Sequence, residues 1–274
     1  MKINTNIVSM QTQNYLRKSN MGLENSMNRL SSGKRINSAA DDAAGLAIAS
    51  RMQTKIMGMD VGVRNSNDGI SLVQTAEAAL GSISNILQRM RELAVQSANG
   101  TYNSSDRKSL NDEYNQLITE IDHIAGNTTF NGVALLQNDG LEVPIQLSDV
   151  AGDTMKITLI KADSTSLNKP DGLSNDITDT VKAGNALDEL DNAITEIADR
   201  RAAFGASLNR LQFNIDNLSS ASTNLSAAKS RIEDADMAKE VSEMTKNKVL
   251  VQSGVSMLSQ ANQNPQMITQ LLQN

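Results

Sequence analysis

A run of apolar residues in the second half of the chain sets the strongest limit on what this sequence can fold into. The run steps by three and four residues in alternation, and only Arg201 and Ser222 interrupt it. This spacing is typical of a coiled-coil helix, and a helix over residues 187–225 extends about 57 Å at ~1.5 Å per residue. Such a helix needs long neighbours. The residues of the run are Leu187, Leu190, Ile194, Ile197, Phe204, Leu208, Leu211, Ile215, Leu218 and Leu225.

Two further helices are predicted in the first half of the chain. One has apolar or small residues at helical spacing and stops at the Asn99-Gly100 pair, which is typical of a helix end. The next begins after Ser105 and Asp106 and ends at Gly126. We therefore expect an antiparallel helical bundle. The expected core positions are Ala76, Leu80, Ile83, Leu87, Met90, Ala94 and Ser97, followed by Leu110, Tyr114, Leu117, Ile121 and Ile124.

The middle of the chain changes character. Between residues 139 and 163 the apolar period becomes 2, which predicts a β-hairpin, and a loop rich in Ser, Asn, Asp, Gly and Pro follows. Aromatic residues make up only 2% of the chain, which favours long, thin helical interfaces over a compact core. The expected fold is mainly α: a long antiparallel helical bundle or coiled coil with a small β-hairpin region, in an elongated, hairpin-shaped subunit.

Both ends of the chain carry apolar residues at helical spacing. These two segments cannot form a stable structure from their own contacts alone. Burying them against each other gains less free energy than ordering the two segments costs, and a pair of helices still exposes its outer faces. Further copies of the same pair would have to cover those faces, through a head-to-tail contact that does not close, so the pattern predicts a filament. We expect assembly through Ile3, Ile7, Met10, Leu16, Leu23, Met27 and Leu30, together with Val251, Val255, Leu258, Met267, Ile268, Leu271 and Leu272.

Charge and composition argue against several partners. The net charge of −6 and the pI near 4.9 disfavour binding to nucleic acid or to an anionic membrane surface. No stretch approaches the roughly 20 apolar residues of a membrane helix, and no secretory signal is recognisable. The chain has no cysteine, so disulfides and thiol chemistry are excluded.

Enzyme chemistry also lacks support. Phosphate-binding glycine loops and the GxSxG pattern are absent, which predicts no nucleotide cofactor and no serine hydrolase. Asp41 and Asp42 fit the capping of a helix better than an acid pair, and the lone His123 does not make a zinc site. We therefore expect no catalytic residue, metal or cofactor.

Four separated segments closely resemble bacterial flagellins, in the same order along the chain. The resemblance covers residues 1–140 and 180–274 and includes loops as well as helices. Little sequence separates the two flanks, so the outer variable domains of longer flagellins have no counterpart here. The segments are "LSSGKRINSAADDAAGLAIASRM" (30–52), "LQRMRELAVQSANGT" (87–101), "NRLQFNIDNLSSASTNLSAAKSRIEDADMAKE" (209–240) and "QANQNPQMITQLL" (260–272).

The resemblance implies a domain plan and a set of partners. Residues 1–44 and 231–274 would form the filament core domain, 45–138 and 177–230 a helical bundle, and 139–176 its β-hairpin and outer loop. The chain would polymerise with itself into the extracellular filament that drives swimming. Its other implied partners are the flagellar type III export apparatus, a cytoplasmic export chaperone on the C-terminal segment, and the filament cap and hook-junction proteins.

The segment "QRMRELAVQ" at 88–96 has two interpretations. From physical chemistry alone, Arg89 and Glu92 lie on a solvated helix face and pair with each other. The resemblance implies instead a contact between subunits, which the vertebrate innate flagellin receptor reads on the free monomer. The implied surface consists of Leu87, Gln88, Arg89, Leu93, Gln96 and Glu113.

Two alternatives to a filament subunit stay open. A hook-filament junction protein of the same family would share the terminal helices but departs from the "RELAVQ" surface. A self-contained coiled-coil adhesin or secreted effector would fold completely as a monomer, with protease-resistant ends.

Overall fold

The computed structural model describes residues 5–168 and 172–271, with side-chain surroundings given through residue 263. The chain is mainly α, as the sequence predicts, with two small antiparallel sheets. The helices are α1 (Ile7–Ser32), α2 (Ala43–Ala98), α3 (Ser104–Asn127), α4 (Thr180–Glu233) and α5 (Met237–Leu271). The strands are β1 (Thr129–Phe130), β2 (Val133–Ala134), β3 (Glu142–Gln146) and β4 (Thr154–Thr158).

The chain divides into two compact units. One, here called the terminal unit, consists of residues 1–56 and 223–274, and the other, the central unit, consists of residues 57–222. Both divisions fall inside long helices, α2 and α4. The domain boundaries inferred from the sequence, at 44 and 231, stay a prediction.

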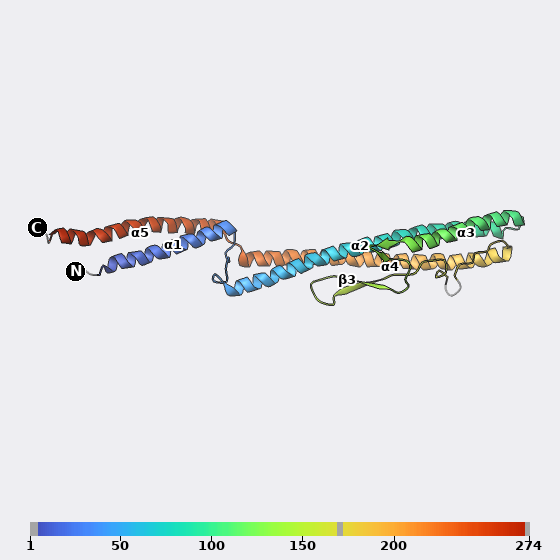
Figure 1. Cartoon of the computed structure of the whole chain (residues 1–274), viewed down its shortest axis with the longest axis horizontal. Coiled ribbons are helices and arrows are strands. Elements are labelled where there is room, and N and C mark those ends of the chain that lie inside the picture. Colours follow the sequence, from blue (N-terminus) through green and yellow to red (C-terminus); the bar gives the residue numbers. More distant parts are fainter. Residues whose placement is uncertain (1–4, 169–171, 272–274) are drawn as a thin grey trace. The chain divides into compact units, whose positions relative to one another are not determined.

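In the terminal unit, α1 runs beside α5, and we call these two helices the terminal pair (Figure 1). The side chain of Asn6 caps α1 by accepting a hydrogen bond from the backbone N–H of Ser9 at 3.1 Å. The helix ends at Gly33, whose φ of 71° lies in the left-handed region that glycine adopts without strain. Both ends of α1 are therefore fixed by local sequence.

The segment between α1 and α2 is held against the end of α4. The backbone N–H of Arg35 donates to the carbonyl oxygen of Glu233 at 2.6 Å, and Ile36 is buried. Asp42 caps α2 by accepting from the backbone N–H of Gly45 at 2.9 Å. Asp41 accepts three hydrogen bonds from Asn37 and Ser38. Both carboxylates therefore accept hydrogen bonds from backbone N–H groups near the start of α2, and Asp42 is the residue that caps the helix.

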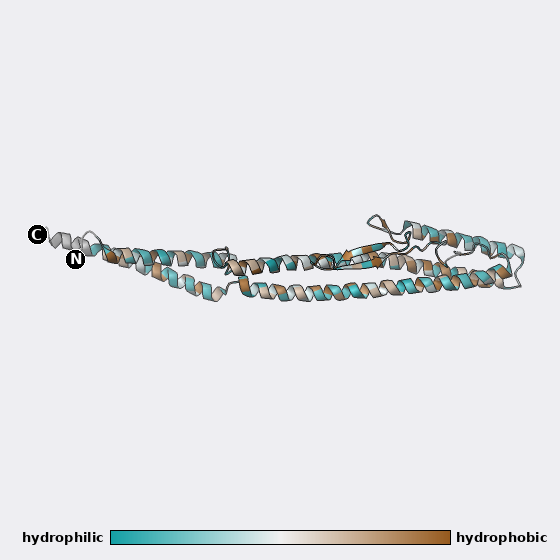
Figure 2. Ribbon diagram, turned by 90° about the horizontal axis from the view of Figure 1, so that it is seen from below, coloured by the Kyte–Doolittle hydropathy of each residue, from teal (hydrophilic) through white to brown (hydrophobic). Residues whose placement is uncertain are grey.

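The core of the central unit follows the sequence stripes closely. All seven expected α2 positions are buried, from Ala76 to Ser97. On α4 the large buried apolar side chains recur every seven residues, and Figure 2 shows apolar and polar residues alternating along the long helices. Those α4 positions are Leu190, Ile197, Phe204, Leu211 and Leu218. A heptad stripe is what two long helices need to share one seam.

The third helix and the two hairpins complete the central unit. Asn103 and Asp106 form a capping box at the start of α3. The predicted hairpin is present as β3 and β4, with Val143 opposite Ile157 and Ile145 opposite Met155. The sequence did not predict the short hairpin formed by β1 and β2.

Candidate functional site

Small residues are among the most deeply buried in the contact between α1 and α5, and half-buried leucines such as Leu16 lie beside them. Ser9 and Ser26 are the buried residues of α1, and Ser9 Oγ lies 3.0 Å from Asn262 Oδ1. Asn6 Nδ2 donates to the carbonyl oxygen of Ala261 at 2.9 Å. Within α1 and the side chains of α5 that the structure describes, Ala261 is the only buried hydrophobic residue. The terminal pair therefore buries little apolar surface by itself.

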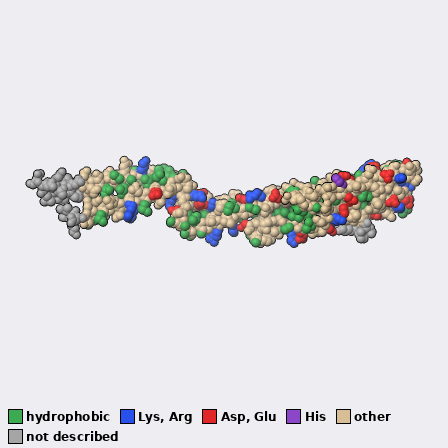
Figure 3. Space-filling view, viewed as in Figure 1, with side chains coloured by type: hydrophobic (Ala, Val, Ile, Leu, Met, Phe, Trp, Pro, Cys, Tyr) green, Lys and Arg blue, Asp and Glu red, His purple; other side chains and the backbone are tan. Residues whose placement is uncertain are grey.

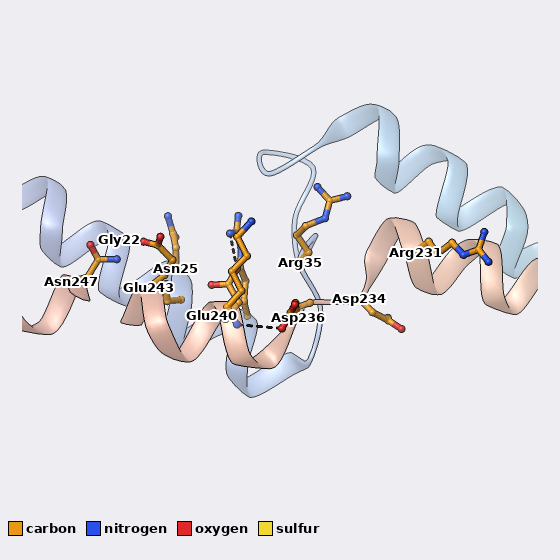
Figure 4. Close-up of a pocket in the computed structure, with 13 residues that line it drawn as sticks. Gly22, Asn25, Arg35, Arg231, Asp234, Asp236, Glu240, Glu243 and Asn247 are labelled. Carbon is orange, nitrogen blue, oxygen red and sulfur yellow. Dashed lines mark hydrogen bonds and ion pairs between the residues drawn. The ribbon is translucent and has the colours of Figure 1, made fainter. Parts of the chain in front are cut away.

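Two glycines let the helices approach each other. A Cβ added to Gly22 would lie 2.9 Å from Nδ2 of Asn247, and one added to Gly254 would lie 3.3 Å from Cδ1 of Leu16. Figure 4 shows Gly22 and Asn247 beside each other on the two helices. Close approach at these positions fixes how far α5 is shifted along α1.

Large apolar side chains lie instead on the outer faces of the pair. Twelve of them are between 46% and 70% exposed, and Figure 3 shows hydrophobic side chains on the surface of this unit. They are Ile7, Val8, Met10, Tyr15, Met21 and Met27 on α1, and Met237, Val241, Val249, Leu250, Val255 and Met257 on α5. An exposed apolar surface of this extent marks an interaction site.

The expected assembly residues divide into groups. Leu16, Leu23, Leu30, Val251 and Leu258 are half-buried, whereas Ile7, Met10, Met27 and Val255 are exposed. Ile3 and Leu272, and the side chains of Met267, Ile268 and Leu271, lie outside what the structure describes.

The expected assembly residues of α1 therefore do not share one face of the helix. The step from Met10 to Leu16 is six residues, which turns a helix by about 240° and moves to another face. Residue spacing also did not single out Val8, Tyr15 and Met21 on α1, or Met237, Val249, Leu250 and Met257 on α5. These residues could have been found from the sequence as the apolar positions that remain after one face of each helix is assigned to the contact between α1 and α5.

The Arg89 patch, defined as Gln88, Arg89, Glu92, Gln96 and Glu113, joins α2 to α3 on the surface of the central unit. Arg89 Nη2 lies 2.8 Å from Glu113 Oε1, and Arg89 Nη1 lies 2.9 Å from Glu92 Oε2. The hydrogen bonds to Glu113 and then to Glu92 raise the pKa of the Arg89 guanidinium. The guanidinium is thus held in one orientation, although its side chain is 50% exposed.

Leu87 and Leu93 do not belong to this surface, which corrects the expectation. They are 0% and 1% exposed, because they lie on the buried stripe of α2. Below the patch, Tyr114 is also fully buried, and burial, together with the charge of Glu189, raises the pKa of its phenol. Its hydroxyl has no hydrogen-bond partner among the described residues.

A polar groove of about 550 Å³ lies within the terminal unit, where the segment after α1 meets the start of α5. Arg29 Nη1 lies 3.2 Å from Glu240 Oε1 beside it, and Figure 4 shows Arg35 and Asp236 nearby. The basic and acidic side chains pair with one another or face solvent, so the groove has the character of a hydrated interface rather than of a substrate pocket.

Other kinds of site find little support in the described ranges. In residues 5–168 and 172–271 no cluster of three metal-binding side chains occurs, and His123 Nδ1 lies 3.9 Å from Glu120 Oε1 on an exposed surface. None of the helices described is both long and apolar enough to cross a lipid bilayer.

Known proteins match both flanks of the chain. The bacterial flagellin N-terminal helical region matches residues 3–140, and the bacterial flagellin C-terminal helical region matches residues 187–272. A flagellin of Listeria innocua is 47% identical over 285 residues, covering 99% of each chain. The flagellar filament 33 kDa core protein of Treponema phagedenis is 40% identical over 285 residues, covering 99% of this chain and 100% of that protein.

A solved structure matches as well. The crystal structure of Bacillus cereus flagellin is 49% identical, has a TM-score of 0.51, and covers 61% of this chain and 94% of its own. The two family regions together span most of the sequence, including both helices of the terminal pair. The chain therefore belongs to the bacterial flagellin family, whose members form the flagellar filament.

Proposed function

We propose that this chain polymerises into the extracellular filament of the flagellum and serves swimming motility. The observation that carries the proposal is the outer surface of the terminal pair, where large apolar side chains such as Val8 and Met257 are 61% exposed. Burying apolar surface stabilises by about 25 cal/mol per Å², so these faces gain free energy when other copies cover them.

A helical polymer fits this surface better than a closed dimer. The exposed residues lie on both helices, and α1 also carries them on two faces, at Val8 and Met10 for example, which are about 200° apart around the helix. A single two-fold contact covers one patch, whereas head-to-tail contacts with several neighbours cover all of them. Copies of this chain are the partner proposed for every face.

Limited proteolysis of monomer and polymer tests the proposal. Protease should remove residues 1–44 and 231–274 quickly from free monomer and slowly after elongation from seeds, because neighbouring copies shield them. Equal protection in dilute monomer would favour the self-contained adhesin or effector instead.

A truncation gives the matched control. Deleting residues 231–274 removes α5 and should abolish polymerisation, while the helical signal and melting of the central unit, residues 57–222, persist. A truncated chain that still elongates seeds would contradict the role of the terminal pair.

The same exposed apolar surface is also a binding site for the export chaperone that we propose. An exposed apolar helix face aggregates in the cytoplasm, and the C-terminal part of α5 presents Val255 and Met257 there. We propose that a chaperone covers this segment before passage through the flagellar type III apparatus. Replacing both residues by Ser should weaken chaperone binding, with Val181→Ser on α4 as an exposed control.

For the Arg89 patch we propose contact with a neighbouring subunit, and recognition by the vertebrate innate flagellin receptor on the monomer. Two carboxylates hold the guanidinium in one orientation on the exposed surface, which favours binding. Arg89→Ala should therefore reduce polymerisation, receptor signalling or both, and Arg91→Ala on the same helix is the matched control.

A hook-filament junction protein is the second candidate within the family, with the same terminal helices. It would be present in few copies and would not elongate by itself. Growth of long polymers from purified chain alone supports the filament subunit, and failure to extend its own seeds would favour the junction protein.

A further inference from the structure

The methionines of this chain are distributed unevenly. The sequence has 13 of them and no cysteine, so sulfur chemistry rests on thioethers alone. Among the described side chains, Met90 and Met155 are buried in the central unit. Six others are exposed, and five of these lie on the terminal pair, on faces proposed to contact neighbouring copies: Met10, Met21, Met27, Met237 and Met257.

An exposed thioether is open to oxidation. A peroxide transfers one oxygen atom to the sulfur: its O–O bond breaks, an S–O bond forms, the sulfur loses two electrons, and water leaves. The five side chains are between 49% and 61% exposed, so the oxidant can reach the sulfur. Met90 and Met155 are 0% and 3% exposed, which shields them.

The product has the opposite polarity to the side chain it replaces. A methionine fills an apolar contact adaptably, whereas its sulfoxide carries a polar oxygen that needs a hydrogen-bond partner when it is buried. The outer faces of the terminal pair also carry large apolar side chains, such as Ile7, Val249 and Leu250, which would be neighbours of the methionines in a packed contact. A sulfoxide there costs little in the free monomer and a great deal in a packed contact.

We propose that the five terminal-pair methionines are an oxidation site that decides whether a monomer can join the polymer. This inference rests on the proposed filament function. Reactive oxidants of the peroxide class would convert exposed monomers to a form that does not elongate, whereas copies already within a polymer would be protected by their neighbours.

The first experiment treats purified full-length monomer with hydrogen peroxide, removes the oxidant, and measures elongation from seeds of untreated polymer. We expect an elongation rate lower by about tenfold or more, with sulfoxide found by peptide mass spectrometry at the five positions and not at Met90 or Met155. Methionine sulfoxide reductases should restore elongation. Unchanged elongation of monomer that is oxidised at all five positions overturns the inference.

A variant with leucine at all five positions separates this chemistry from general damage. Leucine keeps the volume and helix propensity. The variant is compared with its own untreated elongation rate, and that rate should stay unchanged after peroxide. The control variant carries Met90→Leu and Met155→Leu and should stay sensitive. A five-leucine variant that peroxide still inactivates overturns the proposal, since the remaining methionines, Met57 among them, then carry the effect.

Failure of the two ideas can be told apart. Untreated monomer that does not elongate contradicts the filament function itself. Untreated monomer that elongates, with oxidised monomer doing so equally well, contradicts only the oxidation site. A third readout is the polymer: its five terminal-pair methionines should oxidise several-fold more slowly than those of monomer, and equal rates count against the inference.

Discussion

The central unit and the terminal unit use similar residues but place them differently. In the central unit the apolar stripes of α2 and α4 are buried, with Leu80 and Leu190 both at 0% exposure. In the terminal pair the seam is polar, through Ser9 and Asn262, and large apolar residues face outward. The comparison separates a region whose large apolar residues are buried within the chain from one whose large apolar residues stay exposed.

Substitution in the two regions should give the largest contrast. Leu190→Ala leaves a cavity in the central core and should lower the free energy of unfolding by about 2 to 5 kcal/mol, measured by urea denaturation of monomer. Val249→Ala, at a 56% exposed position, should change it by less than about 0.5 kcal/mol yet slow elongation. A similar loss of monomer stability from both would break the comparison.

Two glycines within the long helices of the central unit test how closely that unit is packed. A Cβ at Gly62 would overlap the carbonyl oxygen of Leu147, so Gly62→Ala should destabilise by about 1 to 3 kcal/mol. Gly184 on α4 has no described atom within 4 Å of such a Cβ, and Gly184→Ala should stabilise by about 0.5 to 1 kcal/mol. Thermal melting followed by circular dichroism measures both changes in stability. Changes of the same sign for the two variants would contradict the packing described.

Acid should weaken the terminal unit through Glu233. A hydrogen bond from Lys34, together with Lys229, lowers the pKa of this carboxyl in the folded chain. A depressed pKa stabilises above the unfolded value of about 4.3, and that contribution is lost as pH falls through the folded pKa. The protection factor of the Arg35 amide, whose N–H donates to the carbonyl oxygen of Glu233, should therefore fall below about pH 4.3, after the exchange rate is divided by that of an unfolded peptide at the same pH.

The control for this pH dependence is Glu233→Gln, which keeps the shape and removes the titration. Its Arg35 amide should exchange faster at neutral pH and respond less to acid. An acid response as steep as that of the parent would assign the effect to other carboxyls, such as Asp234.

The smallest effect is expected at Tyr114. Its buried hydroxyl lacks a hydrogen-bond partner among the described residues, so Tyr114→Phe should leave the free energy of unfolding unchanged or raise it by up to about 1 kcal/mol. The surface residues Arg89 and Glu113 should keep their pairing. A clear loss of stability in denaturant titrations would reveal a partner for the hydroxyl.

The sequence predicted the central unit well because its burial is periodic. Every α2 position from Ala76 to Ser97 that the spacing selected is buried, and the seam of α4 follows its heptads. The β1–β2 hairpin was missed because each strand has two residues, although Asn131 and Gly132, both with positive φ, are a typical hairpin turn. The turn residues, rather than the strands, were the sequence feature from which this hairpin could have been predicted.

The terminal unit was harder to predict. The buried residues of its seam on α1 are Ser9 and Ser26, so the seven-residue spacing of the half-buried Leu16, Leu23 and Leu30 is broken by polar residues. The six-residue step from Met10 to Leu16 is also a change of helix face. The contact of Arg35 with Glu233 is made by backbone atoms far apart in sequence, so no side-chain pattern announces it. The orientation of Arg89 likewise depends on α3, which spacing along α2 alone does not place.

The hydrogen bond from Asn6 to Ala261 spans 255 positions of the chain. A polypeptide made or delivered from its first residue onward cannot close this contact until nearly all of it has emerged. Chains cut short by an early stop or a nick lack the second half of the seam and are left without a way to align α1. Only a chain that contains both Asn6 and Ala261 can therefore form the contact between α1 and α5, and it can do so before it binds another copy.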